Sequence, residues 1–154
     1  MKSIILYYSR SGITEKLAKK AQAALGSDIL KVEAEKAYGN FLSSVFRILK
    51  ERKKGITPNS KTEIPNLDSY DNILVGYPVW AGDIPAVFAG FLGKCNLRGK
   101  KVIPFATFGG TSIEQTINTL KRVCPESNIV HQFNYGNSKK DNFDNWIQAI
   151  SGAK

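Results

Sequence analysis

The stretch that decides the fold reads Ser3-Ile4-Ile5-Leu6-Tyr7-Tyr8-Ser9-Arg10-Ser11-Gly12-Ile13-Thr14. Its first half, residues 3–8, is rich in β-branched and aromatic residues, which predicts a short buried strand. Its second half is polar and leads into residues 12–25, where apolar residues recur every three or four positions, as on one face of an amphipathic helix. The stretch therefore predicts a strand, a tight turn and a helix.

The rest of the chain repeats this alternation. Strands are predicted at 28–34, 71–77, 101–108 and 129–133, and helices at 40–54, 83–92, 111–123 and 142–150. Strands that alternate strictly with helices imply a parallel sheet with helices on both faces, because right-handed crossovers place each helix on a face. We predict a three-layer, doubly wound α/β fold with a five-stranded parallel sheet, in one domain over residues 1–154.

The composition excludes several classes of protein. The 154 residues are 42% hydrophobic and 23% charged, as in an ordinary globular domain. The apolar runs fall far short of the ~20 residues that cross a bilayer, no signal peptide is recognisable, and the two cysteines form no CxxC motif. We expect a cytoplasmic protein without a metal site or stable membrane insertion. The net charge of +9 favours anionic partners.

The end of the first predicted strand carries a candidate anion site. In open parallel sheets, ligands bind beyond the carboxyl ends of the strands. At that position the hydroxyl residues Ser9, Ser11 and Thr14 surround Gly12, at the start of a helix whose first N–H groups are unpaired. We interpret this segment as a cup for a phosphate group. The alternative is that Ser11 or Thr14 only caps the helix.

The loops after the third and fourth predicted strands add aromatic and flexible residues. Residues 76–85 carry Trp80 between two glycines and two prolines. A large ring in a surface loop indicates a ligand to lie against, although Trp80 could instead fold back onto the helix predicted at 83–92. Gly109 and Gly110 let the backbone approach a ligand, or only turn the chain. Together the three loops predict a flat aromatic ligand with a phosphate tail.

The sequence resembles the flavodoxin family in three places. Residues 9–14 match the family's T/S-x-T/S-G-x-T motif, residues 76–82 followed by Pro85 are similar to its G-x-P-x-W-x-G stretch, and residues 104–110 precede the fourth helix. Element order and length extend the resemblance over nearly the whole chain and indicate a short-chain member. The resemblance implies a sheet of order 2-1-3-4-5 and FMN bound without a covalent bond.

The same resemblance implies which residues would hold the FMN. The phosphate would be bound by Ser9, Arg10, Ser11, Gly12, Ile13 and Thr14, the isoalloxazine ring would be flanked by Pro78, Val79, Trp80, Ala81 and Gly82, and its other side or edge would be approached by Thr107, Phe108, Gly109 and Gly110. Trp80 would stack on the ring. Related chains often have a second Trp where Ala81 stands and a small hydroxyl residue where Phe108 stands.

The function that the resemblance implies is electron transfer between redox partner proteins. Because this chain carries a net charge of +9, we expect acidic docking surfaces on those partners. The alternative on the same fold is an FMN-dependent NAD(P)H or quinone oxidoreductase, so whether the protein is an enzyme stays open. A flavin-free interaction module is a third possibility. We assign no catalytic residue, and no motif indicates binding to nucleic acid.

The helix predicted at 40–54 combines an apolar stripe with a basic cluster. The stripe consists of Phe41, Leu42, Val45, Phe46 and Leu49, and the cluster of Arg47, Lys50, Arg52, Lys53 and Lys54. We expect the stripe to pack on the sheet. This packing explains the stripe better than binding to a membrane surface does. The basic cluster is then a solvated face near the helix C-terminus, or a docking site for an acidic partner.

Overall fold

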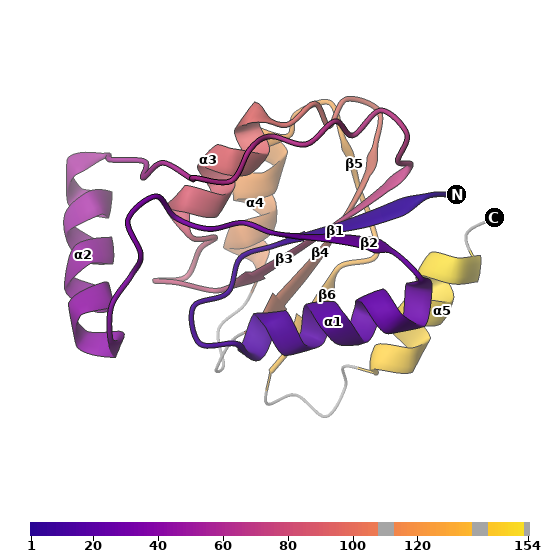
Figure 1. Cartoon of the computed structure of the whole chain (residues 1–154), viewed down its shortest axis with the longest axis horizontal. Coiled ribbons are helices and arrows are strands. Elements are labelled where there is room, and N and C mark those ends of the chain that lie inside the picture. Colours follow the sequence, from indigo (N-terminus) through magenta and orange to yellow (C-terminus); the bar gives the residue numbers. More distant parts are fainter. Residues whose placement is uncertain (108–112, 137–141, 153–154) are drawn as a thin grey trace.

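The strand and helix predicted from the opening stretch lie at the centre of the fold. In a computed structural model that describes residues 1–107, 113–136 and 142–152, β1 (Ser3–Tyr7) is followed by α1 (Ile13–Leu25). The remaining elements, shown in Figure 1, are β2 (Asp28–Lys31), α2 (Phe41–Lys54), β3 (Asn72–Pro78), α3 (Ala86–Lys94), β4 (Lys101–Thr107), α4 (Glu114–Val123), β5 (Asn128–Ile129), β6 (Phe133–Tyr135) and α5 (Phe143–Gly152).

The strands form one parallel sheet. Its order is β2-β1-β3-β4-β5, and β6 pairs with β4 beyond the end of β5. The predicted α/β fold with strand order 2-1-3-4-5 is therefore confirmed. In this order the chain leaves β1 toward β2 on one side and crosses to β3 on the other, so the carboxyl ends of β1 and β3 flank the point where the strand order reverses.

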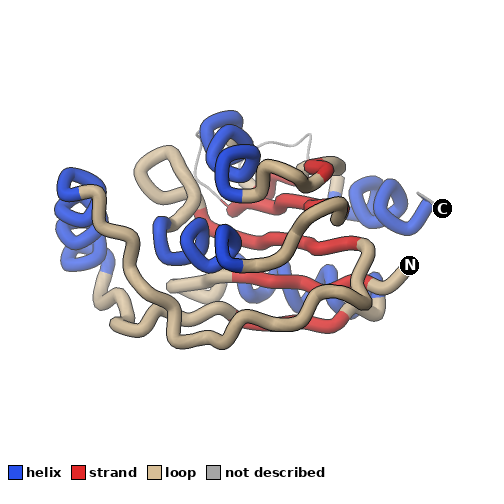
Figure 2. The backbone as a smooth tube through the Cα atoms, turned by 90° about the horizontal axis from the view of Figure 1, so that it is seen from above, coloured by secondary structure: helices blue, strands red, loops and turns tan. Residues whose placement is uncertain are grey.

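Helices cover both faces of the sheet, as Figure 2 shows. Successive side chains of a strand point to opposite faces, so Ile5 belongs to the core under α1 and α5, while Ile4 and Leu6 belong to the core under α3 and α4. The apolar face of α1, predicted from its periodicity, is buried at Leu17, Ala18 and Ala21. None of the described helices is long and apolar enough to span a membrane.

The strand predicted at 129–133 is two short strands, β5 and β6, with a break between them. The break lies opposite Pro104 of β4. The carbonyl of Val102 accepts a hydrogen bond from the N–H of Val130. The backbone of Pro104, two residues further along β4, therefore faces the same neighbouring strand. Proline has no N–H to donate, and the ladder is interrupted there. His131, which we predicted inside the strand, is instead exposed in the break, with a positive φ of 52°.

The apolar stripe of α2 does not pack on the sheet, so that prediction is wrong. Phe41, Leu42, Phe46 and Leu49 are 72%, 63%, 67% and 52% exposed, and Ser44 is the buried residue of the helix. In Figure 1, α2 stands at one end of the molecule, away from the strands. Polar residues of α2 contact the rest of the protein, and the two faces of the sheet are covered by α1 and α5 and by α3 and α4. Periodicity identified an amphipathic helix but not which of its faces meets the protein.

Candidate functional site

The carboxyl ends of β1, β3, β4 and β6 open into one cavity of about 500 Å³. It is lined by Arg10, Ser11, Ile13, Thr14, Pro78, Val79, Trp80, Thr107, Tyr135 and Gly136. The structure thus brings together residues from all three predicted loops, at the switch point of the sheet. Its volume lies in the range of small-molecule sites, roughly 300–1,000 Å³. Phe108, Gly109 and Gly110 lie outside the described residues.

The first wall of the cavity is the start of α1. Gly12 is the N-cap residue, with a φ of 92° that favours glycine, and its N–H donates to Ser9 Oγ at 3.1 Å. Neither Ser11 nor Thr14 caps the helix, because no side-chain hydrogen bond caps it. The first hydrogen bond within α1 is donated by the N–H of Lys16 to Gly12. The earlier N–H groups have no partner within the helix and can bind an anion.

A hydrogen bond between two buried threonines forms the floor of the cavity. The hydroxyl oxygens of Thr14 and Thr107 are 2.7 Å apart, and the two residues are 2% and 6% exposed. The N–H of Val79 donates to the carbonyl of Thr107 at 3.1 Å. Two contacts at Thr107 therefore hold the start of α1 and the loop after β3 against the end of β4. These contacts link the first two predicted loops to the residue at which the third begins.

The second wall is the loop after β3, which turns sharply behind Trp80. Trp80 and Asp83 exchange backbone hydrogen bonds of 2.8 and 3.0 Å, and the two residues between them, Ala81 and Gly82, have φ values of 49° and 79°. These are the φ signs of a type I′ turn. The carboxylate of Asp83 accepts from Thr119 of α4 at 2.8 Å and fixes the turn to the body. Gly82 does not line the cavity but shapes the turn that presents Trp80.

The ring of Trp80 packs edge-on against two tyrosines. Its centroid lies 5.4 Å from that of Tyr8, at an interplanar angle of 88°, and 4.9 Å from that of Tyr38, at 66°. Trp80 is half-buried and packs against the core under α3 and α4, and it also lines, with residues of α3, a separate cavity of about 510 Å³. Burial raises the pKa of Tyr8 to about 12, so this tyrosine stays neutral behind Trp80.

Polar contacts of α2 tie the helix to this same region. Arg47 and Glu51 form an ion pair at 2.6 Å, and the Tyr38 hydroxyl donates to Glu51 at 2.7 Å. Arg52 donates to the carbonyl of Ala81 at 2.6 Å. Between α2 and Trp80 runs a mainly apolar groove of about 290 Å³. It shares Arg10, Val79 and Trp80 with the main cavity, and the rest of its lining is Ala81 and, from α2, Phe41, Ser44, Val45, Ile48 and Leu49.

The charges around the cavity favour an anion at the start of α1. Arg10 is exposed and lines the main cavity, and the helix dipole adds a partial positive charge. The nearest carboxylate of α1, Glu15, is paired with Lys19 and Lys31 at 2.9 Å each. These two ammonium groups, Lys31 first, lower the pKa of Glu15 to about 2. Within the described residues, no cluster of His, Cys, Asp or Glu could hold a metal ion.

Two residues of the cavity were not found by the sequence reasoning. Tyr135, the last residue of β6 and 51% exposed, and Gly136, which follows it, complete the lining. The predicted topology contained a signal for these two residues, because the carboxyl end of the last strand lies at the same edge of a parallel sheet as the carboxyl ends of the other strands. The strand was predicted to end at residue 133, two residues before the end of β6.

Comparison with protein families identifies the chain. A family model described as flavodoxin matches residues 2–150. Because the match spans nearly the whole chain, the protein belongs to the flavodoxin family. A comparison with curated proteins gives no match.

Solved structures agree with this family. A candidate flavoprotein from Bacteroides eggerthii is 28% identical, with a TM-score of 0.78, over 98% of this chain and 96% of its own. One from Bacteroides uniformis is 24% identical, with a TM-score of 0.79, over 97% of each chain. A flavoprotein from Lactobacillus acidophilus, in complex with FMN, is 23% identical, with a TM-score of 0.77, over 94% of this chain and 97% of its own. At these identities the last two support the fold.

Proposed function

We propose that the protein binds FMN in the cavity at the carboxyl ends of β1, β3 and β4, and carries electrons between partner proteins. The observation that carries the proposal is one cavity that joins unpaired N–H groups at the start of α1 to an aromatic wall at Trp80. A ligand with a phosphate at one end and a flat ring at the other matches both. FMN is such a ligand, it is present in the similar Lactobacillus flavoprotein, and it supplies the electron-accepting group.

The residues of the cavity divide into those that touch the ligand and those that shape the site. Ser11, Thr14 and the N–H groups of the first turn of α1 hold the phosphate, and Arg10 lies at the mouth. Pro78, Val79 and Trp80 flank the ring. Ser9 and Gly12 hold the loop closed, while Ala81 and Gly82 present Trp80. Tyr135 offers a further exposed ring on the side of β6.

The partners that we propose are redox proteins with acidic docking surfaces. The net charge of +9 attracts such surfaces at a distance, and Arg10 provides a cation at the mouth of the flavin cavity itself. The cytoplasm is the compartment that we propose for this exchange, because neither cysteine is in a disulfide.

Titration of flavin-free protein with FMN, beside riboflavin, tests the cofactor. We expect FMN to bind at least about tenfold more tightly, because charge-assisted hydrogen bonds to its phosphate contribute roughly 1.5–3 kcal/mol and riboflavin lacks that group. The measurement is the quenching of flavin fluorescence. Equal affinities would refute the assignment of the phosphate to α1, and no quenching by either compound would overturn the proposed function.

The apolar groove beside Trp80 favours a second candidate, an FMN-dependent NAD(P)H or quinone oxidoreductase. The groove could hold a small apolar substrate next to the flavin cavity, with which it shares three residues. We expect the loaded protein to reduce a cytochrome only when a separate reductase is present, and not to oxidise NADH or NADPH by itself. Steady NAD(P)H oxidation with a quinone and no added reductase would favour the enzyme instead.

A further inference from the structure

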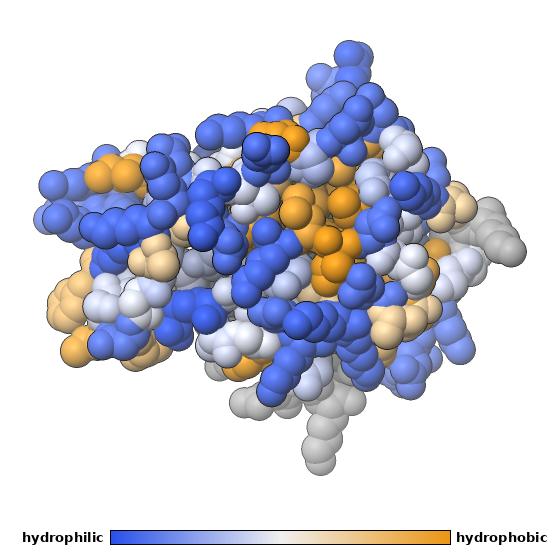
Figure 3. Space-filling view, viewed as in Figure 1, coloured by the Kyte–Doolittle hydropathy of each residue, from blue (hydrophilic) through white to orange (hydrophobic). Residues whose placement is uncertain are grey.

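Among the described residues, α2 carries more exposed large apolar side chains than any other helix or strand. Phe41, Leu42, Phe46 and Leu49 are all more than half exposed, and their spacing places them on one face of the helix. Four large apolar side chains gathered on one exposed helix face indicate an interaction surface. In Figure 3, apolar atoms gather at the lower left of the molecule, where α2 lies. We call this set of four residues the outer stripe.

The contacts of α2 keep Leu42 and Phe46 turned away from the protein, while Phe41 and Leu49 stand at the edge of the groove beside Trp80. The opposite face holds the Arg47–Glu51 ion pair, and Arg47 also donates to the backbone carbonyls of Lys36 and Ala37 at 2.7 and 3.1 Å. Rotation of α2 to bury the stripe would break these bonds and leave charged groups without partners. The exposure of the stripe is therefore built into the way the helix is anchored.

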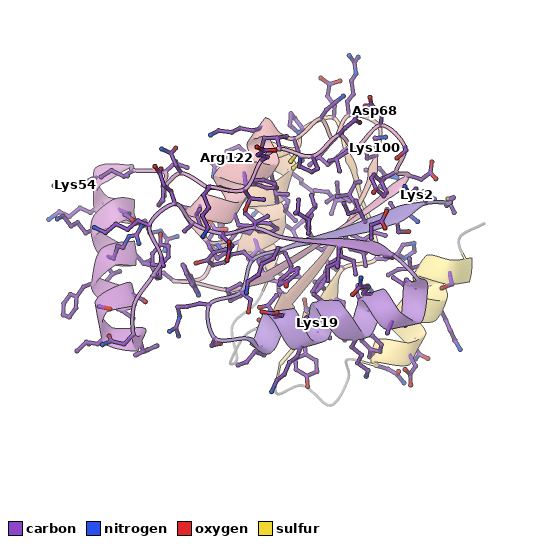
Figure 4. The ribbon with its side chains drawn as sticks, viewed as in Figure 1. Lys2, Lys19, Lys54, Asp68, Lys100 and Arg122 are labelled. Atoms are coloured by element: carbon purple, nitrogen blue, oxygen red, sulfur yellow. The ribbon has the colours of Figure 1, made fainter. Side chains whose placement is uncertain are left out.

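Three lysines accompany the outer stripe on the same helix. Lys50, Lys53 and Lys54 are exposed, and none of them forms an ion pair with a carboxylate in the part of the chain that the structure describes. Arg47 and Arg52, by contrast, are bonded to the body of the protein. Figure 4 shows Lys54 at the end of α2, pointing away from the rest of the molecule. The outward surface of α2 thus combines apolar side chains with three free positive charges.

We infer that α2 is a binding site for an anionic lipid surface. Phe and Leu on one side of a helix, beside Lys, are the features of helices that lie in the membrane interface, where apolar side chains enter the headgroup region and lysines remain at the phosphates. Such binding needs no spanning helix. The inference is independent of the flavin and goes beyond electron transfer between proteins.

Charge and shape favour lipid over other occupants. A second copy of the chain would bring the lysines of two α2 helices together between bodies of charge +9 each, which repel. An acidic protein would need an apolar groove deep enough to accept side chains that project from a convex helix. A lipid interface accepts projecting side chains without a matching groove and supplies the negative charge at the same place.

Cosedimentation of the full-length, FMN-loaded protein with vesicles tests the inference. The vesicles are pure phosphatidylcholine, or an equal mixture with phosphatidylglycerol, in ~0.1 M salt. We expect the partition coefficient to be roughly 100-fold higher on the mixed vesicles than on pure phosphatidylcholine. Each of the three lysines contributes a factor of about five, and the three factors multiply. No sedimentation with the mixed vesicles would overturn the inference, as would a salt-stable dimer that does not sediment.

Two matched pairs of variants separate the stripe from the general charge. We expect Leu42→Ser with Phe46→Ser to reduce binding to mixed vesicles at least about tenfold, while Ile64→Ser, at another exposed apolar residue, has no effect. Lys53→Gln with Lys54→Gln should reduce it roughly 25-fold, and Lys94→Gln with Lys121→Gln much less. Equal losses from the two lysine pairs, or no loss from the serine pair, would contradict a specific α2 site. Unchanged circular dichroism confirms that each variant is folded.

Discussion

Replacement of Ser11 by Asp is expected to weaken FMN binding by on the order of 100- to 1,000-fold and to leave riboflavin binding unchanged. Ser11 is exposed at the start of α1, beside the N–H groups that are proposed to hold the phosphate. A carboxylate there would lie within a few ångströms of the phosphate. Two unit charges 4 Å apart repel by about 4 kcal/mol near a protein surface, and solvent screening at this exposed position reduces that figure somewhat.

The same substitution should not destabilise the fold. Ser11 lies directly before the N-cap Gly12, and a carboxylate at the start of a helix interacts favourably with the helix dipole, by about 0.3–1 kcal/mol. Ser43→Asp is the control for charge at a helix start away from the cavity, because it places a carboxylate three residues after Asn40, the N-cap of α2. Fluorescence titration and urea unfolding of both variants give the comparison. If Ser11→Asp weakens FMN and riboflavin equally, the phosphate does not lie at the start of α1.

The order of the elements was predictable because it depends on local signals. Each strand and helix is marked by its own periodicity, and strict alternation leaves few ways to arrange a parallel sheet. The presence of unpaired N–H groups beside the end of β1 was predictable for the same reason, since a helix start offers them whatever the side chains do. The prediction of one strand at 129–133 was wrong because the break between β5 and β6 depends on Pro104, in a neighbouring strand.

The contacts that complete the site were not predictable from the sequence. The hydrogen bond between Thr14 and Thr107 joins residues 93 positions apart, and no local pattern marks such a pair. Thr14 was interpreted as a possible cap and Thr107 as a residue near the ring, and their mutual contact supplies a structural role for both. The predicted orientation of α2 was wrong for a similar reason, because the orientation depends on the hydrogen bonds of Arg47 and Glu51 to residues outside the helix.

A glycine of the family motif has a structural role that the motif alone did not reveal. Gly76 belongs to the family's G-x-P-x-W-x-G stretch, which contains Trp80, but it does not line the main cavity. It lies in β3, paired in register with Phe105 of β4, and the ring of Phe105 occupies the space where a Cβ of residue 76 would stand. Phe105 is fully buried and packs against Trp146 of α5, with the ring centroids 5.7 Å apart.

Gly76→Ala is therefore expected to destabilise the protein by about 3 kcal/mol, at the upper end of the usual cost of overpacking. The ring of Phe105 is fully buried against Trp146, so it cannot shift without disturbing its neighbours in the core. Gly90→Ala is the control, because the added methyl group meets only the Cγ2 of the exposed Thr57, at 2.6 Å, and a helix favours Ala over Gly by up to about 1 kcal/mol. Urea unfolding measures both free energies.

A double-mutant cycle with Phe105→Ala identifies the ring as the cause. Removal of the Phe105 side chain alone should cost about 3–5 kcal/mol, as for other buried aromatic residues. In that background the methyl group at residue 76 enters space that the ring has left, so the added cost of Gly76→Ala should fall by at least about 1 kcal/mol. Strict additivity of the two substitutions would show that Gly76 is required for its backbone or for the ligand, and not for the packing of Phe105.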